Sequence, residues 1–247
     1  MNALSSMPQS SEVLRVLQSR SATRAFYNRI SSFYDLLSDR SETPMREAAL
    51  RLLAAAEGER ILEIGFGTGH CLVALARSVG PTGKVSGIDL SDSMVELARK
   101  NLAHEHLLAR VDLICGDACS LPYPDNSLDA VLMCFTLELF DTPEIPTVLR
   151  QCLRVLRPGG RLVVASITKT QPRGWALQAY EWTHRHFPNL LDCRPIYVRR
   201  AVAESGFSIR RTIHMKKWIP VAIVLGTKRA QEDHVSPEPQ ERGKKGV

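Results

Sequence analysis

Apolar and polar positions follow two different periods along the chain, and segments of the two kinds alternate. Short apolar runs are typical of buried strands, and between them apolar residues recur every three or four positions, as on one face of a helix. The predicted strands are residues 61–65, 84–89, 111–117, 127–136 and 161–167, and the predicted helices between them are residues 70–80, 91–103 and 143–156. This alternation predicts a parallel sheet that is covered by helices on both faces.

Two helices are expected before the first strand. Residues 12–37 carry apolar side chains at helical spacing. Pro44 is expected to begin a second helix that ends at Gly58, because proline suits the first turn of a helix and glycine its end. At the other end of the chain, residues 228–247 are polar, of mixed charge and poor in large apolar groups, which predicts a disordered tail.

The composition is typical of a soluble globular protein. Hydrophobic residues make up 44% of the 247-residue chain, and no apolar run approaches the roughly 20 residues of a membrane span. The N-terminus lacks the charged head and continuous apolar stretch of a signal peptide. The six cysteines are scattered without the spacing of a metal site, so we expect reduced cysteines, no bound metal and a cytoplasmic location.

The positive charge of the chain is concentrated in one segment. The formal net charge is +6, and residues 184–217 hold eight Lys and Arg against two acids. Such a segment is either a solvated face or a local field that attracts an anionic substrate or an anionic membrane surface. Nucleic acid is not an expected partner, because no recognised nucleic-acid-binding module accompanies the charges.

The densest cluster of glycines is the motif EIGFGTGH, directly behind the apolar run Ile61–Leu62 that begins the first predicted strand. Glycine weakens regular structure, so this density indicates that something approaches the backbone closely. A dinucleotide-binding G-x-G-x-x-G motif would need its third glycine at position 70, where this chain has His70. The observed spacing is E-x-G-x-G-x-G, formed by Glu63, Gly65, Gly67 and Gly69. This spacing favours a nucleoside that carries an amino acid over one that carries a pyrophosphate.

Two more acids follow the next two strands. Asp89 ends the second strand, where a carboxylate can bind both hydroxyls of a ribose. Asp117 ends the third strand, where a carboxylate can accept a hydrogen bond from the amino group of adenine. Each acid taken alone fits a helix cap or a turn as well. Because they occur together and in order behind successive strands, they predict a nucleoside site at the carboxyl edge of the sheet.

At these residues the chain resembles the class I S-adenosylmethionine-dependent methyltransferases. The matching segments are ILEIGFGTGH, GIDLSDSMVELAR, GDACSLPYPDNSLDAVLMCFTLELF and VLRPGGRLVVAS, which together cover about residues 60–167. The resemblance implies an α/β, doubly wound, mostly parallel, Rossmann-like sheet of seven strands whose last strand is antiparallel. It also implies S-adenosyl-L-methionine as the cofactor, with Leu90, Met94 and Ala118 as further cofactor-binding residues.

Within that family the chain is most similar to the ubiquinone/menaquinone biosynthesis branch and to related lipid or small-molecule methyltransferases. The segment FYNRISSFYDLL resembles the N-terminal helical lid that closes over the cofactor in that branch. Tyr34 then becomes a candidate cofactor contact and Tyr27 a candidate catalytic residue, with ordinary packing as the alternative for both. The expected organisation is a lid segment at residues 1–43, a methyltransferase domain at residues 44–227 and the tail.

Candidates for the chemistry of the methyl acceptor are few, since methyl transfer from a sulfonium needs a base only when the nucleophile is protonated. Glu138 follows the fourth strand at the mouth of the crevice, and His184 and His186 are histidines that can titrate near neutrality. Four aromatic residues of the region 168–195 are able to line an apolar pocket for a small-molecule or lipid-like acceptor: Trp175, Tyr180, Trp182 and Phe187. Core packing is the alternative for these aromatics.

The function that follows is transfer of the methyl of S-adenosylmethionine to a small-molecule or lipid-like acceptor, with a quinol precursor as one such acceptor. An NAD-type oxidoreductase is a second hypothesis, which His70 disfavours. A non-catalytic protein that retains the cofactor fold is a third.

Overall fold

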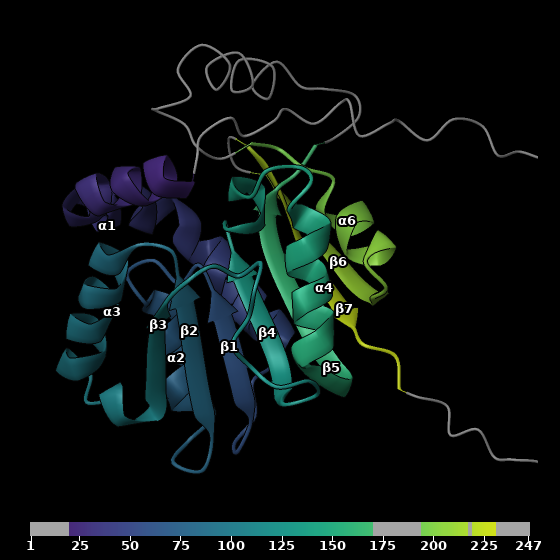
Figure 1. Ribbon diagram of the computed structural model, residues 1–247, viewed down its shortest axis with the longest axis horizontal. Helices are drawn as coiled ribbons and strands as arrows, with labels where there is room; N and C mark the ends of the chain where they lie inside the picture. The colour runs from purple at the N-terminus through teal and green to yellow at the C-terminus, as the bar shows by residue number, and fades with distance from the viewer. Residues whose placement is uncertain (1–19, 170–193, 217–218, 231–247) are drawn as a thin grey trace, which may run out of the picture.

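The structure, a computed structural model, describes residues 20–169, 194–216 and 219–230 (Figure 1). These residues form a seven-stranded sheet with the strand order β3-β2-β1-β4-β5-β7-β6. The strands are β1 (Arg60–Ile64), β2 (Lys84–Asp89), β3 (Val111–Cys115), β4 (Leu128–Cys134), β5 (Leu156–Ile167), β6 (Ser208–Lys216) and β7 (Pro220–Thr227). Strands β1 to β5 pair in parallel, and β7 lies antiparallel between β5 and β6. The predicted mostly parallel, seven-stranded sheet is confirmed.

Helices cover both faces of this sheet. One face packs against α1 (Arg20–Leu53), α2 (His70–Ser78) and α3 (Asp92–His104). The other face packs against α4 (Ile145–Val155) and α6 (Val198–Glu204), which lie together on one side of the sheet in Figure 1. Two short 3-10 turns, η2 (Leu108–Arg110) and η3 (Leu137–Leu139), lie in the connections before β3 and after β4.

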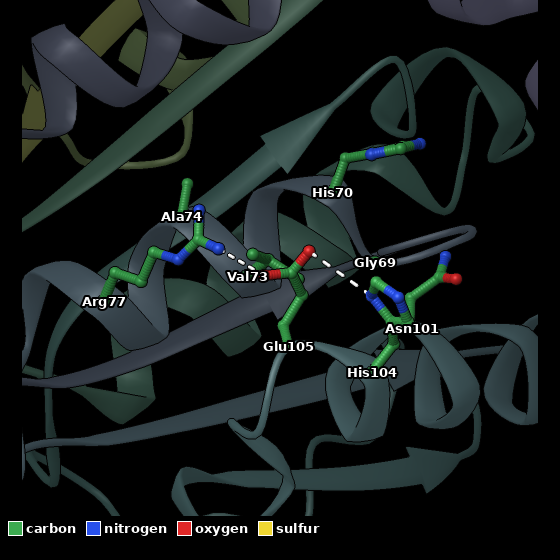
Figure 2. Close-up of a pocket in the computed structure, with 8 residues that line it drawn as sticks. All are labelled: Gly69, His70, Val73, Ala74, Arg77, Asn101, His104 and Glu105. Carbon is green, nitrogen blue, oxygen red and sulfur yellow. Dashed lines mark hydrogen bonds and ion pairs between the residues drawn. The ribbon is translucent and has the colours of Figure 1, made fainter.

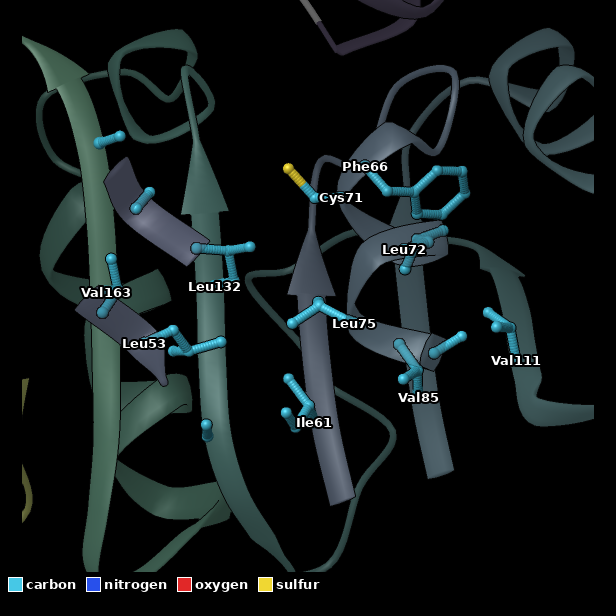
Figure 3. Packing of buried hydrophobic residues seen from close by; sticks show 14 of the residues in the cluster. Leu53, Ile61, Phe66, Cys71, Leu72, Leu75, Val85, Val111, Leu132 and Val163 are labelled. Carbon is cyan, nitrogen blue, oxygen red and sulfur yellow. The ribbon is translucent and has the colours of Figure 1, made fainter. Parts of the chain in front are cut away.

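Each face of the sheet has its own apolar core, because side chains of a strand alternate between the two faces. Ile61 of β1 belongs to the core under α1, α2 and α3, whereas its neighbour Leu62 belongs to the core under α4 and α6. Figure 3 shows the first core, where Leu72 and Leu75 of α2 lie over the strands. Full burial of a leucine or isoleucine stabilises the fold by about 1.5–3 kcal/mol.

The N-terminal helix differs from the prediction. The sequence predicted two helices with a start at Pro44, but α1 is one continuous helix of 34 residues that contains Pro44. Proline removes one hydrogen bond of the helix ladder, which by itself favours a break. Met45, Ala49 and Leu53 follow Pro44 on one face and are buried in the core, so tertiary packing holds the helix together across the proline. The predicted helix residues 12–19 lie outside the described residues.

The C-terminal end of α1 is anchored to the sheet by Arg161 of β5. The guanidinium of Arg161 donates to the carbonyl oxygens of Leu53 and Ala54 at 2.5 and 3.0 Å. It also forms two hydrogen bonds with the carboxylate of Glu59, at 2.7 and 2.6 Å. Carbonyls at the end of a helix have no partner within the helix, so Arg161 satisfies two of them and fixes this end of α1.

Two strand and tail boundaries also differ from the prediction. Strand β5 begins at Leu156, five residues earlier than expected, directly after α4. Lys228, the first residue of the predicted tail, pairs through its backbone with Gly159 and Gly160. Its Nζ donates to Asn126 Oδ1 at 2.6 Å. Residues 231–247 of the predicted tail lie outside the described residues.

Candidate cofactor and active site

The glycine motif forms the loop between β1 and α2, at the carboxyl edge of the sheet. Strand β1 lies between β2 and β4, so the direction of the strand order reverses here. Doubly wound sheets bind ligands in the crevice at such a point. Gly65, Gly67 and Gly69 all have positive φ angles, at 68°, 54° and 90°. Residues other than glycine rarely adopt a positive φ, which is one reason why glycine occupies these three positions.

The three glycines differ in what surrounds them. A Cβ atom at Gly65 would lie 2.2 Å from Thr136 Cγ2, and one at Gly69 would lie 3.0 Å from Ala98 Cβ. These two glycines therefore let the loop pack against the segment after β4 and against α3. A Cβ atom at Gly67 would meet nothing within 4 Å. Gly67 is therefore the position where the loop faces open space that a ligand can enter.

Asp89 connects the glycine loop to the start of α3. Its Oδ2 accepts a hydrogen bond from the backbone N–H of Gly67 at 3.0 Å, and its Oδ1 accepts one from Ser91 N–H at 2.9 Å. Burial raises the pKa of Asp89 to about 6, against the effect of these two hydrogen bonds. The carboxylate thus holds the loop at Gly67 and keeps acceptor capacity at the crevice.

Glu63 is the last acid before the glycine loop, and it is buried with 2% exposure. Its Oε2 has no hydrogen-bond partner within the described part of the chain. Burial raises the pKa of Glu63 well above its usual range, and the nearby Cys71 and Asp89 add to this effect. A buried carboxyl group with an idle oxygen is costly, and a cationic ligand group would relieve that cost.

The other predicted cofactor residues lie on the loops after β2 and β3. Asp117 accepts a hydrogen bond on Oδ1 from the backbone N–H of Cys119 at 2.9 Å, so it shapes a turn two residues beyond β3. Leu90 is half-buried, whereas Met94 and Ala118 are almost fully buried, at 1% and 4% exposure. Leu90 directly follows β2, Met94 lies in the first turn of α3, and Ala118 lies in the loop after β3. None of the three lines the cavity at the glycine loop described below, and their contact with a cofactor stays a prediction.

A small cavity of about 50 Å³ lies at the glycine loop. Glu42 and Arg46 of helix α1 line it together with Glu63 of β1. The remaining lining residues are Gly65, Phe66, Gly67, Thr68, His70, Cys71, Cys134 and Phe135. Figure 3 shows Phe66 and Cys71 at this end of the first core.

Helix α1 is also tied to the loop after Asp89. Arg24 pairs with Asp92 at the start of α3. The hydroxyl of Ser91 donates to Asn28 Oδ1 at 2.5 Å, and Ser91 Oγ in turn caps α3 by accepting from Met94 N–H. Tyr27 and Tyr34 lie on the same helix, but their side chains are outside the described residues, so their roles stay predictions.

Glu138, the candidate catalytic acid after β4, is fully buried in η3. Its Oε1 accepts a hydrogen bond from Ile167 N–H at 3.2 Å, and burial raises its pKa to about 7. His184 and His186 lie outside the described residues, as do the four aromatics of the predicted acceptor region.

Several residues that shape the site were missed from the sequence. Glu42 and Arg46 line the cavity from a helix whose position depends on the whole fold. Asn101 of α3 donates through Nδ2 to the carbonyl oxygen of Thr68 at 2.8 Å and so supports the glycine loop from behind. In the sequence, Asn101 is recognisable only as a polar residue near the end of an amphipathic helix. Many polar residues occupy such positions, so the sequence alone does not indicate that Asn101 contacts the glycine loop.

A larger groove of about 450 Å³ lies between α2 and α3 (Figure 2). Its lining residues are Gly69, His70, Val73, Ala74, Arg77, Asn101, His104 and Glu105. Figure 2 shows that Arg77 and His104 both point toward Glu105. Arg77 forms an ion pair with Glu105, and Nδ1 of His104 lies 3.7 Å from Glu105 Oε1. This groove lacks Glu63, Gly65 and Gly67, all of which line the smaller cavity, so the smaller cavity is the better candidate for the cofactor despite its volume.

The described residues contain neither a membrane-spanning helix nor a cluster of metal ligands. None of the helices in that part of the chain is long and apolar enough to cross a membrane. No group of three or more His, Cys, Asp or Glu residues there is arranged to hold a metal ion.

Comparison with known proteins gives matches along the same segments. Residues 61–160 match a family model described as a methyltransferase domain. A demethylmenaquinone methyltransferase of Listeria monocytogenes serotype 4a (strain HCC23) is 33% identical over 153 residues, which are 60% of this chain. The match spans 63% of that relative's length. A demethylmenaquinone methyltransferase of Geobacillus kaustophilus (strain HTA426) is 38% identical over 141 residues, or 56% of this chain and 59% of the relative.

Among solved structures, the [4+2]-cyclase SpnF aligns with a TM-score of 0.72 and 18% identity, over 88% of this chain and 98% of that one. Because SpnF is described as a cyclase, the shared fold does not by itself imply methyl transfer. Residues 61–160 of this chain are thus similar to a methyltransferase domain, and the sheet order agrees with the fold that this similarity implies.

Proposed function

We propose that this protein transfers the methyl group of S-adenosyl-L-methionine to a small-molecule, quinol-type acceptor. The observation that carries the proposal is the glycine loop, in which Gly67 faces open space and is held by the carboxylate of Asp89. The similarity of this region to demethylmenaquinone methyltransferases supports both the cofactor and the class of acceptor. The NAD-type alternative is disfavoured, because His70 stands where a dinucleotide site has its third glycine.

The residues at the crevice fit this cofactor. When bound, S-adenosylmethionine supplies an electrophilic methyl group on a sulfonium, so the protein needs no metal of its own. In our proposal Glu63 accepts hydrogen bonds from the ammonium of the methionine part through Oε2, which is buried and idle within the described residues. Asp89 binds the ribose hydroxyls, and Asp117 binds the adenine amino group. Gly67 lets the nucleoside lie against the backbone.

Binding also requires a shift of α1. Ligand pockets have volumes of roughly 300–1,000 Å³. The cavity at the glycine loop holds about 50 Å³, and Glu42 and Arg46 of α1 are among its lining residues. Entry of a nucleoside therefore displaces this part of α1, and its return over the ligand excludes water from the reacting methyl.

The acceptor is proposed to approach from a membrane surface. Quinol-type acceptors are apolar, and basic residues cluster near α6 and β6. Arg199 and Arg211 are exposed there, whereas Arg200 forms an ion pair with Glu204 at 2.6 Å. Exposed cations attract anionic lipid headgroups, and each Lys or Arg near such a surface contributes about 1 kcal/mol.

A binding assay and a transfer assay test the proposed function. Isothermal titration of the purified protein with S-adenosylhomocysteine and, separately, with NAD is expected to show binding of the first alone. Transfer of labelled methyl to a reduced naphthoquinol is then expected in the presence of S-adenosylmethionine. A protein that binds S-adenosylhomocysteine but transfers no methyl to any extract would favour the non-catalytic hypothesis. Binding of NAD instead would refute the proposal outright.

A further inference from the structure

Two oppositely charged side chains of α1 line the cavity at the glycine loop. Glu42 and Arg46 are one helical turn apart, and Arg46 Nη1 lies 3.4 Å from Glu42 Oε2. Arg46 Nη2 also donates to Thr43 Oγ1 at 3.0 Å. The side chains are only 14% exposed for Arg46 and 25% for Glu42. The guanidinium is therefore held toward the preceding turn of α1 by two side chains of the same helix.

A second pair with the same spacing in α1 shows what distinguishes the first. Arg51 Nη1 lies 3.3 Å from Glu47 Oε2, and these side chains are 69% and 58% exposed. Exposed pairs of this kind remain solvated and contribute little. Glu42 and Arg46 are mostly withdrawn from water, where an ion pair is costly unless its geometry is good. Their separation of 3.4 Å exceeds the roughly 2.7–2.9 Å of a strong charge-assisted hydrogen bond, so another carboxylate can bind this guanidinium more closely.

Glu63 is the third charged group that lines this cavity. Its Oε2 is buried and has no hydrogen-bond partner within the part of the chain that the structure describes. Burial raises the pKa of Glu63, and the positive charge of Arg46 acts in the opposite direction. One small cavity thus contains an acceptor for a cation and a donor for an anion. An α-amino acid carries an ammonium and a carboxylate on the same carbon atom, so it matches both groups at once.

We propose that Arg46 binds the carboxylate of an α-amino acid group and that Glu42 is the partner of Arg46 only until this ligand arrives. The inference rests on the proposed function, in which Glu63 binds the ammonium of the methionine part of the cofactor. The carboxylate of that part replaces Glu42 at Arg46, and the planar guanidinium donates to both of its oxygens. Glu42 turns toward the solvent, where part of its side chain already lies.

This exchange of partners makes Glu42 an internal competitor of the ligand. A ligand that has the carboxylate must break the pair of Glu42 with Arg46, so its apparent affinity is lower than its affinity for the open site. A ligand that lacks the carboxylate leaves the pair in place. The two kinds of ligand therefore respond differently to changes at Glu42 and Arg46.

The test compares the affinities of S-adenosylhomocysteine and decarboxylated S-adenosylhomocysteine, which lacks only the carboxylate, by isothermal titration. Arg46→Met removes the charge and keeps an unbranched side chain. It is expected to weaken binding of S-adenosylhomocysteine by about 10- to 100-fold and binding of the decarboxylated form by less than about threefold. The matched control is Arg51→Met, which removes the exposed pair of the same spacing. It is expected to change neither affinity by more than about twofold.

Glu42→Gln gives a test of the opposite sign, which a loss of folding cannot imitate. Removal of the competing charge is expected to strengthen the binding of S-adenosylhomocysteine by about threefold. The affinity for the decarboxylated form is expected to stay the same. If Arg46→Met does not fold, the direction of the change in Glu42→Gln decides between the proposal and a purely structural pair.

Three results would overturn this inference and leave the proposed cofactor in place. The first is an equal loss of affinity for both ligands in Arg46→Met, which is the mark of a structural role. The second is an Arg46→Met variant that binds S-adenosylhomocysteine as tightly as the parent protein. The third is unchanged or weaker binding of S-adenosylhomocysteine by Glu42→Gln. A parent protein that binds neither ligand would instead refute the proposed function.

Discussion

Replacement of Glu138 by glutamine is expected to stabilise the protein at alkaline pH. Burial raises the pKa of Glu138 from 4.5 to about 7 in the folded state. Because the folded state holds this proton more tightly than the unfolded state, the free energy of unfolding is highest below about pH 4.5 and falls as the pH rises to 7. Each pKa unit corresponds to about 1.4 kcal/mol, so the ionised group costs the fold about 3 kcal/mol above pH 7.

Chemical denaturation at pH 5 and at pH 8 measures this effect. Relative to the parent protein, Glu138→Gln is expected to gain about 3 kcal/mol in unfolding free energy between the two pH values. Glu96→Gln, which changes an exposed glutamate on α3, is expected to follow the parent at both pH values. Equal differences between Glu138→Gln and the parent at pH 5 and pH 8 would refute the assignment of a raised pKa to Glu138. If Glu138→Gln is more stable than the parent protein but loses methyl transfer, Glu138 serves the function of the protein at a cost in stability.

Five further predictions concern the cofactor site and the surface. Asp89→Ala is expected to weaken S-adenosylhomocysteine binding by about 1–3 kcal/mol, because two hydroxyls lose a charged acceptor. In the parent protein the affinity for S-adenosylhomocysteine is expected to fall as the pH drops below about 6, where Asp89 takes up a proton. Titrations of both proteins at several pH values measure the two effects. An affinity of the parent protein that stays constant down to pH 5 would contradict the role of the carboxylate. Gly67→Ala is expected to abolish the binding of S-adenosylhomocysteine. Gly159 also has a positive φ and open space around it, and Gly159→Ala is expected to lose only about 1 kcal/mol of stability. Equal affinities of the two variants for S-adenosylhomocysteine would show that Gly67 does not contact the ligand. Amide exchange in residues 20–40 is expected to slow when S-adenosylhomocysteine binds. Identical exchange with and without the ligand would show that α1 packs on the sheet without responding to the cofactor. Reversal of charge at Arg199 and Arg200 is expected to reduce binding to anionic liposomes and leave cofactor affinity intact, and salt-insensitive binding by the parent would refute the membrane proposal.

The sheet and the glycine loop were predictable because their signals are local. The run Ile61–Leu62 followed by the glycines predicts a strand and a tight loop without knowledge of any distant residue. The carboxylates that follow β2 and β3 then meet at one edge, because parallel strands end on the same side. What the local pattern did not reveal is why Gly65 and Gly69 have no room for a side chain. That reason lies in Thr136 and Ala98, which are distant in sequence.

The continuity of α1 and its place over the cavity were not predictable in this way. The rule that proline begins a helix is local, whereas the burial of Met45 and Leu53 against the sheet depends on tertiary packing. Glu42 and Arg46 look like an ordinary ion pair one helical turn apart, and the pair is indeed present at 3.4 Å. Only the position of α1 in the fold shows that the same two side chains line the cavity at the glycine loop.

The proline inside α1 has a mechanical consequence. The part of this helix from Arg20 to Pro44 is about 36 Å long, so a tilt of about 5° at Pro44 moves Arg20 by roughly 3 Å. Arg161 clamps the end at Leu53, whereas the far end is held by polar contacts of Arg24 and Asn28 with the start of α3. Pro44 stands between the clamp and these contacts, at the turn where the helix lacks a hydrogen bond. The helix is therefore expected to bend at Pro44 while its C-terminal end stays fixed. Pro44 lies between Glu42 and Arg46, the two residues of α1 that line the cavity at the glycine loop.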